Sequence, residues 1–290
     1  MSEVIVPQTQ HTDMSGVKRD HQGKEKVGRP RQDRDKAKDA PRNAYTYMFE
    51  SFRDELDEHH DRRMKIGKVS RDVTALSKKI IFSLQRVRKL NQPLPARIKA
   101  ENDERLKEIA ELLVTIEGDV AGMRRWRYPL ICLEEFVEAV SFAHYVQHQS
   151  LITPQQAQEA LPADIPLTPP DYVFGVFDLT GEMMRFATAV TALTGSMPAS
   201  SGAGEEPPRT ILKDLQDVSS MLQICPTVGG KPGTYAKKLD IMIEQVSKVE
   251  RLGYGVTVRG NERPKGWMPD LNEPTHDGGG GGYDNDVSMD

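Results

Sequence analysis

ICLEEFVEAVSFA at residues 131–143 and DYVFGVFDLTGEMMR at residues 171–185 are the stretches that decide the fold. At helical pitch both are apolar on nearly every side, so they predict two buried helices at the centre of an all-α protein. Each helix also carries two acids on one face, Glu135 with Glu138 and Asp178 with Glu182. Four carboxylates are therefore expected to converge between two packed helices.

These four acids are expected in an apolar environment. Ile131, Phe142 and Tyr145 fall on the same side of the first helix as its two glutamates, which predicts a packed interior there. Like charges at this spacing repel, and a desolvated carboxylate is costly unless it is paired, protonated or bound to a metal. A divalent cation resolves the conflict most simply. Because all the donors are oxygens, Mg²⁺ is favoured, with Mn²⁺ as the alternative.

Other chemistries lack their sequence patterns. A di-iron site in a helical bundle expects Glu-x-x-His, and no histidine stands three residues after either glutamate of the first helix. No phosphate-binding loop follows a predicted strand, and there is no C-x-x-C motif. In a non-catalytic alternative, the acids balance internal cations, with Arg185 as the obvious partner. One arginine cannot offset four carboxylates, which favours the metal.

The rest of the chain extends the helical pattern. Apolar stripes or helix-start signals predict further helices from about residue 44 to 90, 95 to 116, a short one from 154, 209 to 224 and 234 to 258. Thr168 followed by Pro169 and Pro170 predicts the start of the second acidic helix. We therefore predict one bundle of about seven helices over residues 43–260. The polar segment 1–42 and the Gly-rich acidic segment 261–290 are predicted to be disordered tails.

Composition restricts the class of protein. The net charge is −4, with ten Lys or Arg against seven Asp or Glu in residues 1–42 and six acids in residues 270–290, so the body is close to neutral. A near-neutral body argues against a broad basic surface for duplex DNA. Two cysteines, Cys132 and Cys225, predict buried free thiols in a reducing compartment.

The sequence also bears on location. It contains no N-terminal signal segment and no apolar run long enough to span a membrane, so we expect a soluble intracellular protein. The basic residues between 18 and 38 are typical either of a nuclear import signal or of a solvated tail. Both cytoplasm and nucleus are therefore expected locations.

A basic and aromatic segment precedes the first acidic helix. Arg124, Arg125, Trp126 and Arg127 suit single-stranded nucleic acid, because arginine neutralises phosphate and an aromatic ring stacks on a base. The alternative is a helix end whose aromatic residues pack inward while the arginines stay in water. The nearby acids favour the nucleic-acid interpretation.

Several stretches together resemble the translin family, and within it the translin-associated factor X (TRAX) branch. The resemblance spans about residues 45–269. It is carried by FRDELD at 52–57, SRDVT at 70–74, LEEFVEAVSF at 133–142, SLI at 150–152, DLTGEMMR at 178–185, KVE at 248–250 and VRG at 258–260. The chain departs from the TRAX pattern at residues 124–128, at 196–208 and in the Gly-rich tail.

The resemblance implies a seven-helix bundle that assembles with a translin-like subunit into a closed hetero-octamer enclosing RNA. It implies a Mg²⁺-dependent endoribonuclease that cleaves single-stranded or nicked small RNAs, including passenger-strand fragments and tRNA processing intermediates. The family's acidic catalytic residues fall, by motif, on Glu135, Glu138, Asp178 and Glu182. Translin itself is the nucleic-acid-binding subunit, so a non-catalytic, single-stranded nucleic-acid-binding and assembly subunit is the alternative.

Overall fold

The computed structural model describes residues 43–161, 163–200, 208–229 and 233–259. The predicted tails at 1–42 and 261–290, the basic cluster within the first of them, and most of the loop at 196–208 lie outside these residues. The chain divides into two compact units, Met1–Asp57 and Glu58–Asp290, and each is described by itself.

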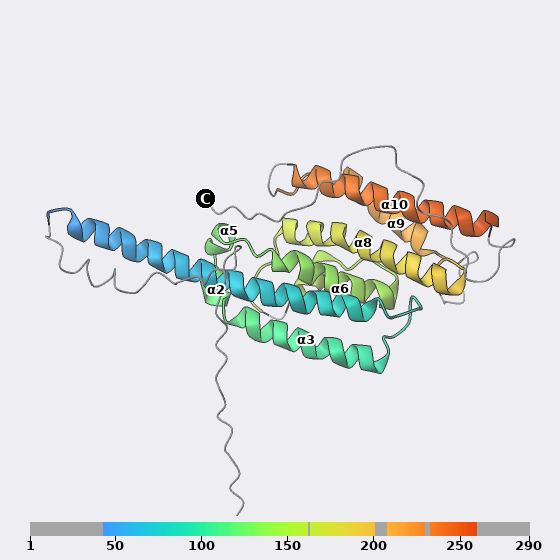
Figure 1. The fold of residues 1–290 in the computed structure, drawn as a ribbon, viewed down its shortest axis with the longest axis horizontal. Helices are drawn as coiled ribbons and strands as arrows, with labels where there is room; N and C mark the ends of the chain where they lie inside the picture. The colour runs from blue at the N-terminus through green and yellow to red at the C-terminus, as the bar shows by residue number, and fades with distance from the viewer. Residues whose placement is uncertain (1–42, 162, 201–207, 230–232, 260–290) are drawn as a thin grey trace, which may run out of the picture. The chain divides into compact units, whose positions relative to one another are not determined.

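The described residues form an all-α fold, as predicted (Figure 1). Apart from one isolated bridge between Ala199 and Thr210, they contain no β-structure. No helix among them is long and apolar enough to cross a membrane. The one-turn helices α4 and α5 are not predicted as separate helices by the apolar periodicity of the sequence. The helices are α2 (Thr46–Leu84), α3 (Ala96–Val114), α4 (Glu117–Val120), α5 (Arg124–Arg127), α6 (Cys132–His148), α7 (Pro154–Ala160), α8 (Pro169–Thr194), α9 (Ile211–Ile224) and α10 (Thr234–Arg259).

The described part of the first unit, residues 43–57, contains the start of α2. The Asn43 side chain accepts a hydrogen bond from the Tyr45 backbone N–H at 2.9 Å, and the Thr46 hydroxyl accepts one from the Asn43 N–H at 2.9 Å. These bonds satisfy donors at the beginning of the helix. Phe49 and Phe52 make an edge-to-face contact with ring centroids 6.2 Å apart, and both rings are exposed.

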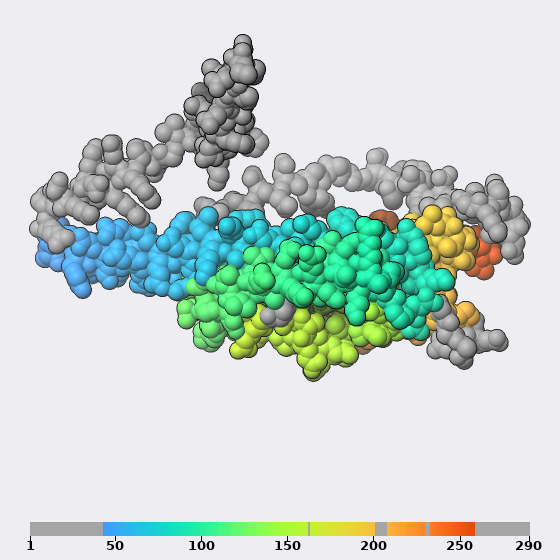
Figure 2. All heavy atoms as spheres, turned by 90° about the horizontal axis from the view of Figure 1, so that it is seen from below, coloured from blue at the N-terminus to red at the C-terminus, as the bar shows by residue number. Residues whose placement is uncertain are grey.

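In the second unit, α6 and α8 form the central packed pair (Figure 1). α8 also packs against α9 and α10. Figure 2 shows the part of α2 after Asp57 beside α3, and the Ser83 hydroxyl of α2 donates a 2.6 Å hydrogen bond to the Asn102 side chain of α3. Phe142 of α6 and Phe186 of α8 are fully buried and meet edge to face at 6.1 Å. This pair of helices holds the two acidic segments against each other.

Local sequence signals set both ends of α8. Thr168 accepts a hydrogen bond from the Asp171 N–H, and the Asp171 carboxylate accepts one from the Thr168 N–H at 2.8 Å, which completes a capping box. At the other end Gly195 has φ = 73°, the left-handed conformation that ends helices and favours glycine. The predicted bounds of this helix are thus confirmed.

Two expectations about burial are wrong. Ile131, the residue directly before α6, is 67% exposed instead of buried. Cys132 is buried, and burial raises the pKa of its thiol to about 11. The second wrong expectation concerns Cys225, which follows α9 and is only half-buried instead of buried.

A glycine sets the spacing between α6 and α8. A Cβ atom added at Gly175 would lie 2.7 Å from the Val137 Cβ and 2.8 Å from the Glu134 carbonyl oxygen. Real side-chain carbons do not approach a backbone oxygen this closely, so only glycine lets the helices come this near. Gly175 lies one turn before Asp178, so this close approach brings the second acidic pair up to the first.

We expect Gly175→Ala to destabilise the protein by about 1–2 kcal/mol, since overpacking outweighs the better helix propensity of alanine. Gly67→Ala in α2 is the matched control. Its added Cβ meets only the end of the Arg71 side chain at 3.8 Å, so a gain of up to about 1 kcal/mol is expected. Urea unfolding of both variants measures the difference, and equal effects at the two sites would contradict the argument.

Candidate active site

The four predicted acids line one open pocket with a volume of about 540 Å³. α6 contributes Glu135 and Glu138, and α8 contributes Asp178 and Glu182. α2 and α10 supply the remaining walls. The other residues that line the pocket are Lys78, Ile81, Phe82, Gly181, Met184, Arg185 and Gln245.

Three of these acids have a basic partner. Glu135 lies 3.3 Å from the Lys78 ammonium group of α2. Asp178 accepts a 2.6 Å hydrogen bond from Lys238 of α10. Lys78 and Lys238 therefore supply positive charge that the sequence argument, which counted Arg185 alone, did not include.

Glu182 has two partners, one on its own helix. It pairs with Arg185 at 3.1 Å and accepts a 2.7 Å hydrogen bond from the Gln85 amide. Arg185 is thus an internal counterion, as the non-catalytic alternative expected. The Gln85 Oε1 atom is buried without a hydrogen-bond partner in the described structure, so an acceptor next to Glu182 is left unused.

Glu138 differs from the other three acids in having no basic partner among the described residues. It is only 7% exposed. Burial raises the pKa of this carboxyl to about 8, and the negative charges of Asp178, Glu135 and Glu182 add to the rise while Lys238 opposes it. The site therefore holds a carboxyl that is largely protonated at neutral pH until a positive charge compensates it.

Glu134 is a fifth carboxyl near the pocket that sequence reasoning did not select. Burial raises its pKa to about 7, although the Lys238 ammonium group, 3.9 Å away, acts in the opposite direction. The Lys238 ammonium also lies 5.6 Å from the centre of the Phe174 ring. Lys238 of α10 thus interacts with acids of both α6 and α8. Only the tertiary structure reveals these interactions.

The donor set fits a hard divalent cation in its chemistry. Every candidate ligand is a carboxylate oxygen, and Glu138 lacks the compensating charge that its neighbours have. Within the described ranges, however, no three Asp, Glu, His or Cys side chains already converge as a ready-made metal cage. Glu135, Asp178 and Glu182 instead contact Lys78, Lys238 and Arg185, so metal binding requires these three side chains to exchange partners.

The four residues of the basic segment differ in their exposure to solvent. Arg124, Trp126 and Arg127 of α5 are exposed, Trp126 by 66%. Arg125 is buried and donates a 2.5 Å hydrogen bond to the Asp171 carboxylate at the start of α8. Three of the four predicted nucleic-acid-binding residues are therefore available to a ligand, whereas Arg125 belongs to the core.

A family model described as "Translin family" matches residues 61–260, which cover the described helices from Asp61 in α2 onward. The chain belongs to the translin family. Its acidic pocket lies entirely within the matched residues.

Curated relatives extend this result. Translin-associated protein X of Rattus norvegicus is 30% identical over 271 residues, which cover 83% of this chain and 89% of the relative. The homologue of that protein in Schizosaccharomyces pombe is 29% identical over 73% of this chain and 87% of its own length. A solved structure titled "Crystal structure of AfC3PO" is 19% identical, with a TM-score of 0.48 over 73% of this chain and 97% of that one. This structural similarity is too low to bear on function.

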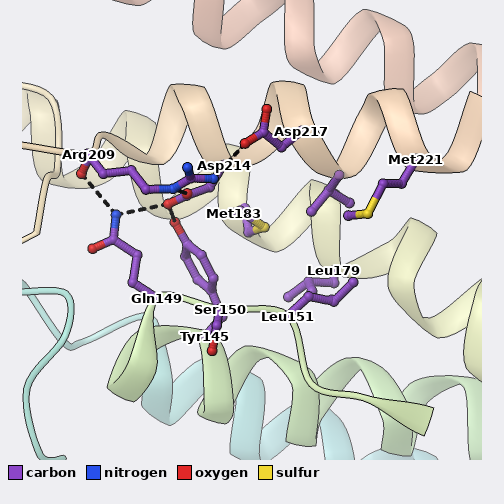
Figure 3. Close-up of a pocket in the computed structure, with 11 residues that line it drawn as sticks. Tyr145, Gln149, Ser150, Leu151, Leu179, Met183, Arg209, Asp214, Asp217 and Met221 are labelled. Atoms are coloured by element: carbon purple, nitrogen blue, oxygen red, sulfur yellow. Dashed lines mark hydrogen bonds and ion pairs between the residues drawn. The ribbon is translucent and has the colours of Figure 1, made fainter.

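This translin-family chain has a second polar cluster, where α6 meets α9 (Figure 3). The buried Asp214 carboxylate accepts hydrogen bonds from the Tyr145 hydroxyl at 2.8 Å, from the Gln149 amide at 2.9 Å and from Arg209. Burial raises the pKa of Tyr145 well above its ordinary value, with a further contribution from Asp214. The adjoining pocket is only about 100 Å³, and its carboxylate is already saturated. We interpret the cluster as a structural link.

The pKa of Glu138 predicts a pH-dependent stability in metal-free protein. The pKa of the Glu138 carboxyl is about 8 in the folded chain and near 4.5 in the unfolded chain. Between pH 4.5 and pH 8 the folded chain therefore keeps a proton on Glu138 that the unfolded chain has lost. This contribution favours folding below about pH 4.5 and is progressively lost as the pH rises to about 8. Glu138→Gln should therefore be more stable than the wild type at pH 8.5 by about 2 kcal/mol or more.

Urea unfolding in EDTA at several pH values between 5 and 8.5 measures this effect. The advantage of Glu138→Gln should shrink as the pH falls. The exposed Glu111 of α3 provides the control, since Glu111→Gln should leave the pH dependence unchanged. Parallel pH profiles for wild type and Glu138→Gln would contradict the prediction.

Proposed function

We propose that this chain is the catalytic subunit of a metal-dependent endoribonuclease that assembles with a translin-like partner. The observation that carries the proposal is the meeting of Glu135, Glu138, Asp178 and Glu182 in one pocket. The membership of the translin family and the similarity to proteins named Translin-associated protein X support the partner. We propose a hetero-octameric assembly and single-stranded or nicked small RNAs as substrates, with passenger-strand fragments and tRNA processing intermediates as examples.

The four carboxylates would hold Mg²⁺, or Mn²⁺ in its place. When bound, the ion would supply a Lewis acid that neutralises charge on the scissile phosphate and acidifies a water molecule. Before the ion binds, Lys238 holds the Asp178 carboxylate at 2.6 Å. A carboxylate that does not itself hold the ion, Glu138 or Glu182, would act as the general base that accepts the proton of the attacking water.

The second candidate function is a non-catalytic subunit that binds single-stranded nucleic acid and supports assembly. The ion pairs of Lys78, Lys238 and Arg185 favour it, because they compensate three acids without any metal. In that case the pocket is a polar cross-link between helices, and RNA contacts come from surfaces such as the exposed part of α5.

Cleavage of labelled RNA distinguishes the two functions. The chain would be co-expressed with a translin-like partner, and the purified assembly incubated with a 5′-labelled single-stranded RNA in Mg²⁺, Mn²⁺, Ca²⁺ or EDTA. Cutting that requires Mg²⁺ or Mn²⁺ and stops in EDTA supports the nuclease. Retention of RNA without cutting under every condition would leave the binding subunit as the function.

A further inference from the structure

Phe82 is an exposed aromatic residue at the acid pocket. It lines the pocket yet is 65% exposed, whereas Ile81 and Leu84 beside it on α2 are buried in the core. Among the described residues that line the pocket, it is the only aromatic one. A single exposed phenylalanine needs no explanation by itself. Because Phe82 lies beside the four acids, however, an RNA bound at the acid pocket would contact its ring.

Exposed cations accompany the ring. Lys78 lies one helical turn before Phe82 on the same face of α2, and its side chain is 55% exposed. Arg185 of α8 lines the same pocket with a side chain 57% exposed. Each contacts one carboxylate, at 3.3 and 3.1 Å, and an ammonium or guanidinium group has further N–H donors to offer.

An aromatic ring accompanied by cations suits single-stranded nucleic acid, because a base stacks on the ring while the positive charges bind phosphates. The pocket volume of about 540 Å³ suits a ligand of nucleotide size. An unpaired base is required, since bases within a duplex are already covered by their neighbours.

We propose that Phe82 stacks on an unpaired base of the RNA next to the scissile phosphate, while Lys78 and Arg185 bind the flanking phosphates. The inference rests on the proposed function, because the acids supply the cleaving centre to which the stacked base is adjacent. Stacking there selects single-stranded RNA and fixes which phosphodiester bond reaches the carboxylates. Phe82 is thus a substrate-binding residue that determines the register of cleavage.

The test combines changes to the ring with changes to the base, using the co-expressed assembly. Phe82→Ala and Phe82→Leu should raise KM, and the Kd measured in EDTA, by about tenfold, whereas Phe82→Trp should preserve both. A series of oligonucleotides carries one abasic site at each successive position along the RNA. For the wild type, one abasic position should weaken binding by a similar factor, and Phe82→Ala should be insensitive to that position.

Leu193→Ala is the matched control. Leu193 lies on α8 and is exposed like Phe82, but it does not line the acid pocket, so neither KM nor Kd should change. Light scattering of every variant checks that the assembly is intact.

The outcomes separate this inference from the function on which it rests. If the wild type cleaves RNA but Phe82→Leu binds and cleaves equally well, stacking is refuted and the nuclease stands. If the wild type binds without cleaving, the nuclease fails, and the abasic series in EDTA still decides whether Phe82 stacks on a base. Loss of the assembly in both Phe82→Leu and Phe82→Trp would overturn the inference and identify Phe82 as a contact with a protein partner.

Discussion

Replacing Asp178 with alanine should lower the rate of RNA cleavage by at least about 100-fold, equivalent to about 2.7 kcal/mol on the barrier. The carboxylate lies in the acid pocket and is held by Lys238 at 2.6 Å, so its loss removes a ligand that the proposed cation needs. Folding should be little affected, because Asp178 is partly exposed and Lys238 retains Glu134 at 3.9 Å. Glu135→Ala is expected to behave in the same way.

Single-turnover cleavage with saturating enzyme measures the chemical step, and light scattering together with RNA binding in EDTA shows whether the assembly survives. Glu111→Ala, an exposed acid on α3, should cleave like the wild type. Normal cleavage by both Asp178→Ala and Glu135→Ala would remove the acids from the reaction and leave them as structural residues.

Replacing Arg125 with alanine should destabilise the protein by about 3 kcal/mol, close to the effect of breaking a buried ion pair. Arg125 and Asp171 are both buried, and the guanidinium group lies 2.5 Å from the carboxylate. The substitution leaves a cavity and a carboxylate without its cation. The two hydrogen bonds from Thr168, at 2.8 and 2.7 Å, limit the loss because they still satisfy Asp171.

The neighbouring arginines of α5 provide controls of the same residue type. Arg124 and Arg127 are exposed, so replacing either with alanine should change the unfolding free energy by less than about 0.5 kcal/mol. Urea unfolding compares the three variants. The prediction fails if Arg125→Ala is no less stable than Arg124→Ala. RNA binding by these two surface variants separately tests whether α5 contacts nucleic acid.

Local sequence was sufficient to predict most of the helices. The capping box of Thr168 and Asp171 and the glycine at 195 act within one helical turn, so their residue types alone fix where α8 begins and ends. The spacing of the two acidic pairs was equally informative, because i,i+3 and i,i+4 positions share a face in any helix. In the structure these four residues line one pocket.

Side-chain partners between distant segments could not be predicted in this way. Arg125 looked like its exposed neighbours, and its pairing with Asp171 depends on a residue 46 positions away. Lys238 and Asp178 are 60 positions apart and meet only because α10 packs against α8. The exposure of Ile131 is likewise visible only in the tertiary structure.

The sequence by itself thus determined that the chain is all-α, where its main helices run and which faces carry acids, because these properties depend on residues within a few positions of one another. Only the tertiary structure decided which cations compensate those acids, which acid has no basic partner among the described residues, and which arginine of α5 is buried. These properties depend on distances between helices, and the close approach at Gly175 sets the most important of them.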